Sequence, residues 1–359
     1  MMKKRTLLIS LLIVVLIVGV VGFDLAQLQA GLEKPTEAVL EIASAETQTK
    51  SPALPITAYD HFSVSVEEDI LVDVHMREAP DAMANIVMIH GAGGGAWAWE
   101  IYFEQFPEIY NLYAISWRGH FTSSPVEDAD TAAYVRDQTA AITAIANRNN
   151  LPIHVIGHSY GGATSVLATA HAVDQVASLH LIAPVVPLDY TFLQAQLVPL
   201  IMPPILRNAT TAEQTAAEAT AASGEDSDGS GTYAGMFLDQ AQMERYWDLY
   251  AGKPFSVEKP SLIAVDGLNP DWQIKLAKAY STIGTADLPV WFLIARYDNV
   301  VIPSEQYETA TEIGASITEL ESGHYIQLDI KANESAAIIL ANLNMLNVEA
   351  SNDSNANGG

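Results

Sequence analysis

Apolar residues recur along the chain in two patterns, and both predict β-strands. Between His61 and Met76 apolar and polar residues alternate, which predicts an antiparallel hairpin at the edge of a sheet, with one solvated face. Later runs are apolar at nearly every position, as in strands that are covered on both faces. These runs span residues 86–89, 112–115, 153–156, 179–182, 290–294 and, more weakly, 316–320.

Stretches of helical composition separate these runs. Buried strands that alternate with helices predict an α/β fold with a mostly parallel sheet, built here from residues 59–189 and 288–346. The alternation stops over residues 190–287, where a proline-containing apolar run (192–206) leads into Ala-, Thr- and Glu-rich sequence. We therefore expect an inserted helical cap there. The polar tail, 347–359, is expected to be disordered.

The N-terminus has the pattern of a targeting segment. Three basic residues at positions 3–5 precede an uncharged apolar run over 7–23, which predicts a signal or membrane anchor in residues 1–23. Residues 24–58 have no apolar period and are expected to form a flexible tether. The basic start favours export of the folded domain to the periplasmic or extracellular side of a membrane. Secretion after cleavage of the segment is the alternative.

Charge and cysteine content exclude several classes of partner and chemistry. The 359 residues carry 17 Lys and Arg against 43 Asp and Glu, a formal net charge of −26. Such a surface repels phosphate backbones, so nucleic acid is not expected as a partner. The chain has no cysteine, which excludes disulfides, cysteine metal sites and a cysteine nucleophile. The oligomeric state stays open.

The segment Gly157-His158-Ser159-Tyr160-Gly161 has the G-x-S-x-G pattern of a nucleophile elbow. It lies between an apolar, strand-like run and a small-residue, helix-like run, as the elbow requires. Glycines on both sides leave room for a tight turn that presents the Ser159 hydroxyl at the tip of the sheet. Ser159 is therefore the predicted nucleophile.

A serine nucleophile needs a histidine base and an acid that orients it. His324 lies in a turn after the last predicted strand, and Asp298 follows the strand over 290–294. Both positions are at the carboxyl ends of strands, where sites form in open α/β sheets. Glu305 is a weaker alternative for the acid, and Asp287 lies at the wrong end of its strand.

The reaction also needs donors for a developing oxyanion. The backbone N–H of Tyr160, directly after the nucleophile, is one candidate. A glycine-rich loop, His90 to Gly95, follows the strand over 86–89, and the N–H of Ala92 in this loop is the second candidate. The loop has neither the G-x-G-x-x-G spacing nor the Gly-Lys-Ser/Thr ending of a phosphate-binding loop.

With the His90-Gly91 loop, the elbow, Asp298 and His324 in this order, the chain resembles the α/β-hydrolase superfamily over about residues 60–346. It looks closest to the cap-bearing serine esterase and lipase-like branch. The resemblance implies an eight-stranded, mostly parallel sheet flanked by helices, with an antiparallel second strand, and no metal or organic cofactor. It departs from the family loop D-x-R-G-x-G-x-S at two positions, where Ser116 and Phe121 replace the aspartate and a glycine.

We therefore expect a serine hydrolase that cleaves an ester of a small molecule through an acyl-enzyme. Gly91, Trp97 and Trp247 are candidate substrate contacts, and the apolar entrance of the cap favours an uncharged acyl group. The same site would serve an amidase, thioesterase, carbon–carbon hydrolase or perhydrolase. A non-catalytic binding protein on this fold is a further alternative. The histidines have no helical ligand spacing with a carboxylate, so no metal site is expected.

Overall fold

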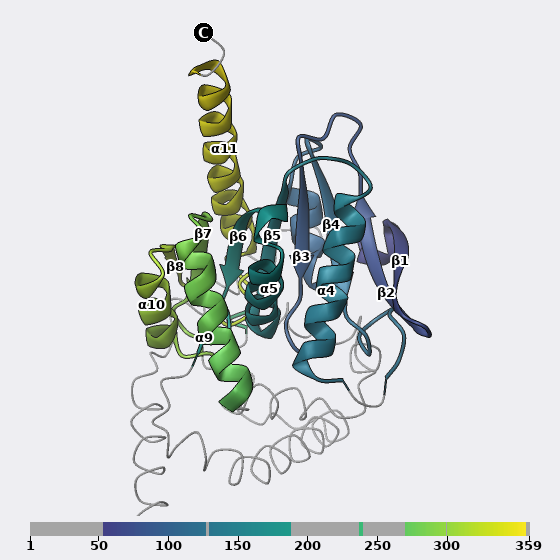
Figure 1. The fold of residues 1–359 in the computed structure, drawn as a ribbon, viewed down its shortest axis with the longest axis horizontal. Helices are drawn as coiled ribbons and strands as arrows, with labels where there is room; N and C mark the ends of the chain where they lie inside the picture. The colour runs from purple at the N-terminus through teal and green to yellow at the C-terminus, as the bar shows by residue number, and fades with distance from the viewer. Residues whose placement is uncertain (1–52, 127–128, 188–236, 240–269, 299, 357–359) are drawn as a thin grey trace, which may run out of the picture.

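The computed structural model describes residues 53–126, 129–187, 237–239, 270–298 and 300–356 (Figure 1). The expected anchor (1–23), nearly all of the expected tether, most of the expected cap including Trp247, and residues 357–359 lie outside these ranges. Among the described residues, no helix combines the length and hydrophobicity needed to cross a membrane.

The strands of the described chain form one eight-stranded sheet in the order β1-β2-β4-β3-β5-β6-β7-β8. Their bounds are β1 (Asp60–Glu67), β2 (Ile70–Arg77), β3 (Ala84–Ile89), β4 (Tyr110–Ser116), β5 (Ile153–His158), β6 (Val176–Ile182), β7 (Val290–Ala295) and β8 (Ser316–Leu320). Strands β3 to β8 pair in parallel, whereas β2 is antiparallel to both β1 and β4. The predicted edge hairpin and the mostly parallel sheet are both confirmed.

Helices cover both faces of the sheet (Figure 1). The helices are α3 (Glu100–Gln105), α4 (Thr131–Ala146), α5 (Ser159–His171), α9 (Pro270–Thr285), α10 (Pro303–Glu312) and α11 (Ala332–Ala356), with short 3-10 turns η1 (Ile56–Ala58), η2 (Ala96–Trp99) and η3 (Val173–Gln175). Local sequence explains two helix starts. At α4 the Asp130 carboxylate accepts a 2.7 Å hydrogen bond from the N–H of Ala133, and at α10 Pro303 is the first residue.

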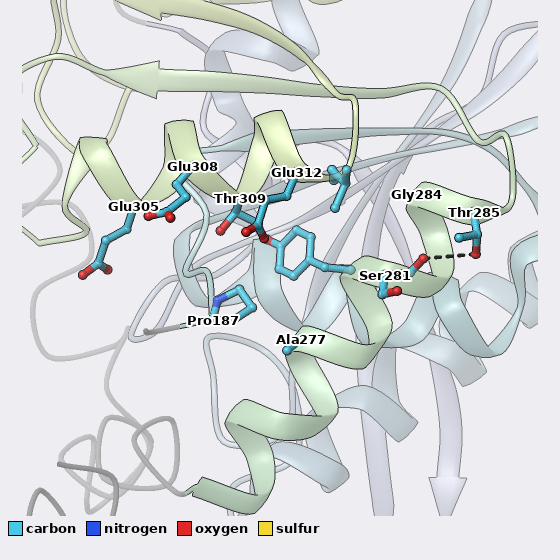
Figure 2. A pocket seen from close by; sticks show the side chains of 11 residues that line it. Pro187, Ala277, Ser281, Gly284, Thr285, Glu305, Glu308, Thr309 and Glu312 are labelled. Carbon is cyan, nitrogen blue, oxygen red and sulfur yellow. Dashed lines mark hydrogen bonds between the residues drawn. The ribbon is translucent and has the colours of Figure 1, made fainter. Parts of the chain in front are cut away.

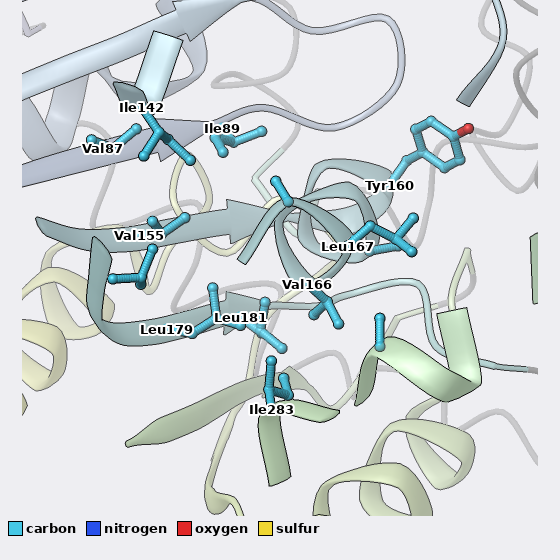
Figure 3. Packing of buried hydrophobic residues seen from close by; sticks show 14 of the residues in the cluster. Val87, Ile89, Ile142, Val155, Tyr160, Val166, Leu167, Leu179, Leu181 and Ile283 are labelled. Carbon is cyan, nitrogen blue, oxygen red and sulfur yellow. The ribbon is translucent and has the colours of Figure 1, made fainter. Parts of the chain in front are cut away.

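Two clusters of buried side chains lie on opposite faces of the sheet. Side chains from α4, α5 and α9 pack on one face around Val155 and Leu181, as Figure 3 shows. On the other face, α3, η2 and α11 pack around Ile156 and Leu293. Successive strand residues point to opposite faces, so strands covered on both sides must be apolar at nearly every position. This explains the continuous apolar runs in the sequence.

Three boundaries differ from the sequence-based expectation. Helix α9 lies within the range expected for the cap, yet it packs against α5 as part of the sheet domain. Residues 53–58, expected in the tether, join the domain because the buried Ile56 donates its N–H to Glu100 at 2.8 Å. The last helix continues to Ala356 instead of ending near residue 346, since neither proline nor glycine interrupts it before Gly358.

Candidate active site

A sharp turn joins β5 to α5 and carries Ser159 at its tip. Ser159 has a backbone φ of 55°, the left-handed region that is strained for a residue with a side chain. A Cβ atom on Gly157 would lie 2.4 Å from the Ser165 hydroxyl oxygen, and one on Gly161 would lie 2.0 Å from the His90 carbonyl oxygen. Only glycine fits at either position, so the elbow depends on both.

The fold brings the three predicted catalytic side chains together from separate strand ends. Ser159 follows β5, Asp298 follows β7 and His324 follows β8. The Nε2 atom of His324 lies 2.8 Å from the Ser159 hydroxyl oxygen, and its Nδ1 atom lies 2.8 Å from Oδ2 of Asp298. All three side chains are buried, with Ser159 the most exposed at 7%. The imidazole therefore bridges the hydroxyl and the carboxylate.

The hydrogen bonds around Asp298 determine which way the protons point. Its Oδ1 atom accepts the backbone N–H groups of Val300 at 2.8 Å and Val301 at 2.9 Å, which holds the carboxylate in place. Its Oδ2 atom then accepts Nδ1–H of His324, because a carboxylate only accepts. The Nε2 atom of His324 is left with a lone pair that accepts the Ser159 hydroxyl proton.

The neighbouring residue in the elbow, His158, supports the loop that carries His324. Its Nε2–H donates to the backbone carbonyl of His324 at 3.0 Å, and the two rings lie 4.8 Å apart. Complete burial lowers the pKa of His158 well below its ordinary value, and the neighbouring His324 adds to this effect. A neutral ring therefore packs beside the imidazole of the predicted base.

The backbone of the predicted oxyanion loop is oriented by His90. The His90 ring accepts the N–H of Trp117 at 3.3 Å through Nε2, so its Nδ1–H donates to the carbonyl of Gly91 at 2.7 Å. The N–H of Gly94 also donates to this carbonyl at 3.1 Å. Because a peptide is planar and trans, the Ala92 N–H points away from the Gly91 carbonyl. The two hydrogen bonds to the Gly91 carbonyl therefore also fix the direction of the Ala92 N–H, which points the opposite way.

The two predicted oxyanion donors are carried by segments next to the nucleophile. Gly91 lies so close to the elbow that a Cβ atom on it would be 2.9 Å from the Cβ of Ser159. Ala92, the next residue, is exposed. Tyr160 is in the first turn of α5, where backbone N–H groups are not used by the helix itself. The roles of the Ala92 and Tyr160 N–H groups as oxyanion donors stay predictions.

The loop that departs from the family pattern forms hydrogen bonds with the predicted oxyanion loop and with Ala96 beyond it. The Ser116 hydroxyl accepts the N–H of Ala96 at 3.0 Å, and Nε2 of His120 accepts the N–H of Gly93 at 3.3 Å. Burial lowers the pKa of His120 to about 4, which keeps the ring neutral and able to accept. Phe121 has a φ of 50°, a conformation in which a glycine would be unstrained.

The three predicted substrate contacts lie in different surroundings. Gly91 lies beside Ser159, as described above. Trp97 is 7% exposed and packs into the cluster on the α3 side of the sheet, and its role in substrate binding stays a prediction. Trp247 lies outside the described residues.

Sequence reasoning missed Asp329, a buried carboxylate five residues after His324. Its Oδ2 atom accepts the Gly323 N–H at 2.8 Å and the Ser322 hydroxyl at 3.0 Å, which holds the turn before His324. Burial raises the pKa of Asp329, and the backbone N–H groups around it oppose this rise. The available signal was a carboxylate between two apolar residues, Leu328 and Ile330, shortly after His324. The supporting role of His158 was missed as well.

A separate hollow of about 520 Å³ lies between α9 and α10, and none of the three predicted catalytic residues lines it. Figure 2 shows Glu305, Glu308 and Glu312 along α10, across from Ala277 and Ser281 of α9. This places Glu305, the weaker candidate for the orienting acid, in the wall of the hollow. Within the described ranges, no three His, Asp or Glu side chains are grouped to hold a metal ion.

Comparison with known proteins supports the same fold. The lipase LipV of Mycobacterium tuberculosis is 32% identical over 121 residues, which cover 33% of this chain and 45% of that lipase. The haloalkane dehalogenase DatA of Agrobacterium tumefaciens superposes with a TM-score of 0.59 at 15% identity, over 80% of this chain and 97% of DatA. A carboxylesterase structure from Nitrososphaera gargenis superposes with a TM-score of 0.57 at 15% identity, over 80% of this chain and 100% of that chain.

The two structural relatives differ in the chemistry that their names describe, so at 15% identity they support the fold alone. The match to LipV covers less than half of that lipase, so its activity does not transfer to this chain directly. The sequence profile of the alpha/beta hydrolase family matches residues 86–334, most of the sheet domain. The chain therefore belongs to the alpha/beta hydrolase family.

Proposed function

We propose that this protein is a serine hydrolase that cleaves carboxylic esters of small molecules. The observation that carries the proposal is the position of His324, whose ring nitrogens lie 2.8 Å from the Ser159 hydroxyl and 2.8 Å from the Asp298 carboxylate. A base in contact with both a nucleophile and an orienting acid is the arrangement that acyl transfer to serine needs.

In the proposed reaction, Ser159 Oγ attacks the ester carbonyl while its proton moves to Nε2 of His324. The carbonyl oxygen becomes an oxyanion, which the N–H groups of Ala92 and Tyr160 stabilise. When the tetrahedral intermediate collapses, the carbon–oxygen bond to the alcohol breaks and Nε2–H protonates the leaving oxygen. Asp298 stabilises the imidazolium and holds its tautomer.

Water completes the cycle. A water molecule gives a proton to Nε2 of His324 and attacks the acyl carbon, and the second intermediate releases the carboxylic acid as Ser159 regains its proton. Each oxyanion donor is expected to lower the barrier by about 3 kcal/mol. The apolar character of residues 192–206 supports an uncharged, hydrophobic acyl group.

The test is a fluorophosphonate probe followed by a series of short- and long-chain aryl esters. We expect wild-type protein to be labelled and to turn over esters, and Ser159→Ala to do neither. Ser281→Ala, which removes an exposed serine on α9, is the matched control and should behave as wild type. Labelling without ester turnover would indicate another bond, such as an amide, thioester or carbon–carbon bond. An unlabelled wild type would favour a non-catalytic binding protein.

We also propose that residues 1–23 direct export and anchor the protein in a membrane, with the hydrolase domain on the periplasmic or extracellular side. The basic residues at positions 3–5 and the apolar run that follows support this location. Cell fractionation tests it: full-length protein should sediment with membranes, and protein lacking residues 1–30 should not. Expression of the full-length gene that yields a soluble exported product with a shortened N-terminus would indicate cleavage instead.

A further inference from the structure

The buried carboxylate of Asp329 joins two segments that are far apart in the sequence. The backbone N–H of Leu238 lies 3.0 Å from both of its oxygens, and that of Asp239 lies 3.0 Å from Oδ1. On the other side, Oδ2 accepts the Gly323 N–H at 2.8 Å and the Ser322 hydroxyl at 3.0 Å. One carboxylate thus binds the stretch between β6 and α9 to the turn before the predicted base.

Ring contacts connect the same two segments independently of these hydrogen bonds. Phe237 stacks on Tyr325 with ring centres 5.0 Å apart and an angle of 8°. Tyr325 lies 4.8 Å from the His158 ring, which in turn lies 4.8 Å from the His324 ring. Residues 237–239 therefore contact the segment that follows His324 through Tyr325 as well as through Asp329.

We propose that Asp329 is a positioning residue that fastens residues 238–239 to the loop of His324, so that the alignment of His324 with Ser159 depends on this segment staying in place. Its effect on activity rests on the proposed function; its effect on the two segments does not. Among the described residues, the hydrogen-bond partners of Asp329 belong to residues 238–239 and 322–323 and not to Ser159, so Asp329 acts through the backbone that carries His324.

The chemistry of the site explains why a carboxylate is needed. Three backbone N–H groups and one hydroxyl point at Asp329, which is 4% exposed, and a carboxylate has lone pairs enough to accept them all. An asparagine has the same shape but replaces one accepting oxygen with an NH₂ donor. In Asp329→Asn, that donor would face other donors, and buried N–H groups would lose their acceptor.

The experiment is site-resolved hydrogen exchange on the full chain, with kcat/KM measured in parallel. For Asp329→Asn, we expect exchange at the amides of Leu238, Asp239 and Gly323 to rise together by at least tenfold. At a temperature below the melting temperature of the variant, we expect its kcat/KM for an aryl ester to be at least tenfold lower than that of the wild type. Phe237→Leu, which removes the ring contact from the inserted side, should also speed exchange in residues 322–325.

Asp137→Asn is the matched control, because Asp137 is a fully buried carboxylate that binds Arg118, away from His324. It should lower the melting temperature but leave exchange at residues 238, 239 and 323 unchanged. Unchanged exchange in Asp329→Asn would overturn the proposal, as would faster exchange confined to one of the two segments. A loss of stability with wild-type kcat/KM would reduce Asp329 to a purely structural role.

The two proposals fail in different ways. If wild-type protein does not react with a fluorophosphonate, the proposed function is wrong, whereas the exchange measurements still decide the role of Asp329. The NMR resonance of the His324 Nδ1 proton gives a second readout that needs no substrate. It should be shifted or broadened in Asp329→Asn and unchanged in Asp137→Asn.

Discussion

His324 is the residue through which each proton transfer of the proposed reaction would pass. Its alignment comes from three sides: Asp298 binds Nδ1, His158 binds its backbone carbonyl, and Asp329 holds the residue before it. Because these contacts restrict the motion of the His324 ring, the ring needs little reorganisation to accept the serine proton. Preorganisation of this kind is a main source of catalytic power.

The contribution of Asp298 is testable without disturbing the fold. In Asp298→Asn, the amide can present an N–H to the imidazole and so favour the wrong tautomer, with a lone pair on Nδ1 and the proton on Nε2. Such a ring cannot accept the Ser159 proton, and kcat is expected to fall by about 10⁴-fold.

The measurement is kcat on an aryl ester, with the melting temperature as the check on folding. Glu305→Gln, which changes the alternative acid in the hollow between α9 and α10, should leave kcat near wild type. If Glu305→Gln caused the large loss and Asp298→Asn did not, the assignment of the orienting acid would be wrong.

At the scale of elements, α9 belongs to the sheet domain, although its position in the sequence indicated the cap. It lies at the end of the stretch expected to form the cap, but it covers the sheet beside α5. Its buried hydrophobic residues recur three or four positions apart, which is typical of a helix with one face on a core. They are Trp272, Leu276, Ala279, Tyr280 and Ile283.

This packing predicts a clear difference between two neighbouring positions. Leu276 is fully buried, and Leu276→Ala should lower the free energy of unfolding by about 2–5 kcal/mol through lost burial and a residual cavity. Ile274, on the opposite face, is 67% exposed, and Ile274→Ala should change it by less than about 0.5 kcal/mol. Urea titration measures both. Equal effects would mean that α9 does not pack on the sheet as described.

At the scale of the whole molecule, buried histidines make stability depend on pH. Burial lowers the pKa of His120 and of His154 to about 4 and that of His180 to about 3, against an ordinary value of 6.5. Between pH 6.5 and about 4 the unfolded chain therefore binds protons that the folded protein does not. Stability is complete above pH 6.5 and is lost as the pH falls through this window.

We expect each of these histidines to contribute on the order of a few kcal/mol to the loss between pH 7 and pH 4. His154→Gln should therefore flatten the dependence of the melting temperature on pH. His171→Gln, at an exposed position on α5, is the control and should keep the wild-type slope. A melting temperature that rises as the pH falls from 7 to 4 would contradict this account.

Much of the architecture and of the candidate site could be predicted from local sequence. Strands with both faces covered must be apolar at nearly every position. The sharp turn from β5 into α5 requires glycine at positions 157 and 161. Both features depend on residues that are adjacent in the sequence, so a local pattern predicts them. The chain order of Ser159, Asp298 and His324 at the ends of separate strands was readable for the same reason. Parallel strands bring their carboxyl ends to one edge.

Only the tertiary structure decided which distant backbone groups those side chains hold. His158 binds a carbonyl 166 residues away, and Asp329 binds an amide 91 residues away. The alternation of strands and helices stops over residues 190–287, so the sequence placed α9 in the cap. Hydrophobic periodicity shows which face of a helix is buried, but not which element covers that face. The supports of His324 and the place of α9 follow from contacts that form only when the chain is folded.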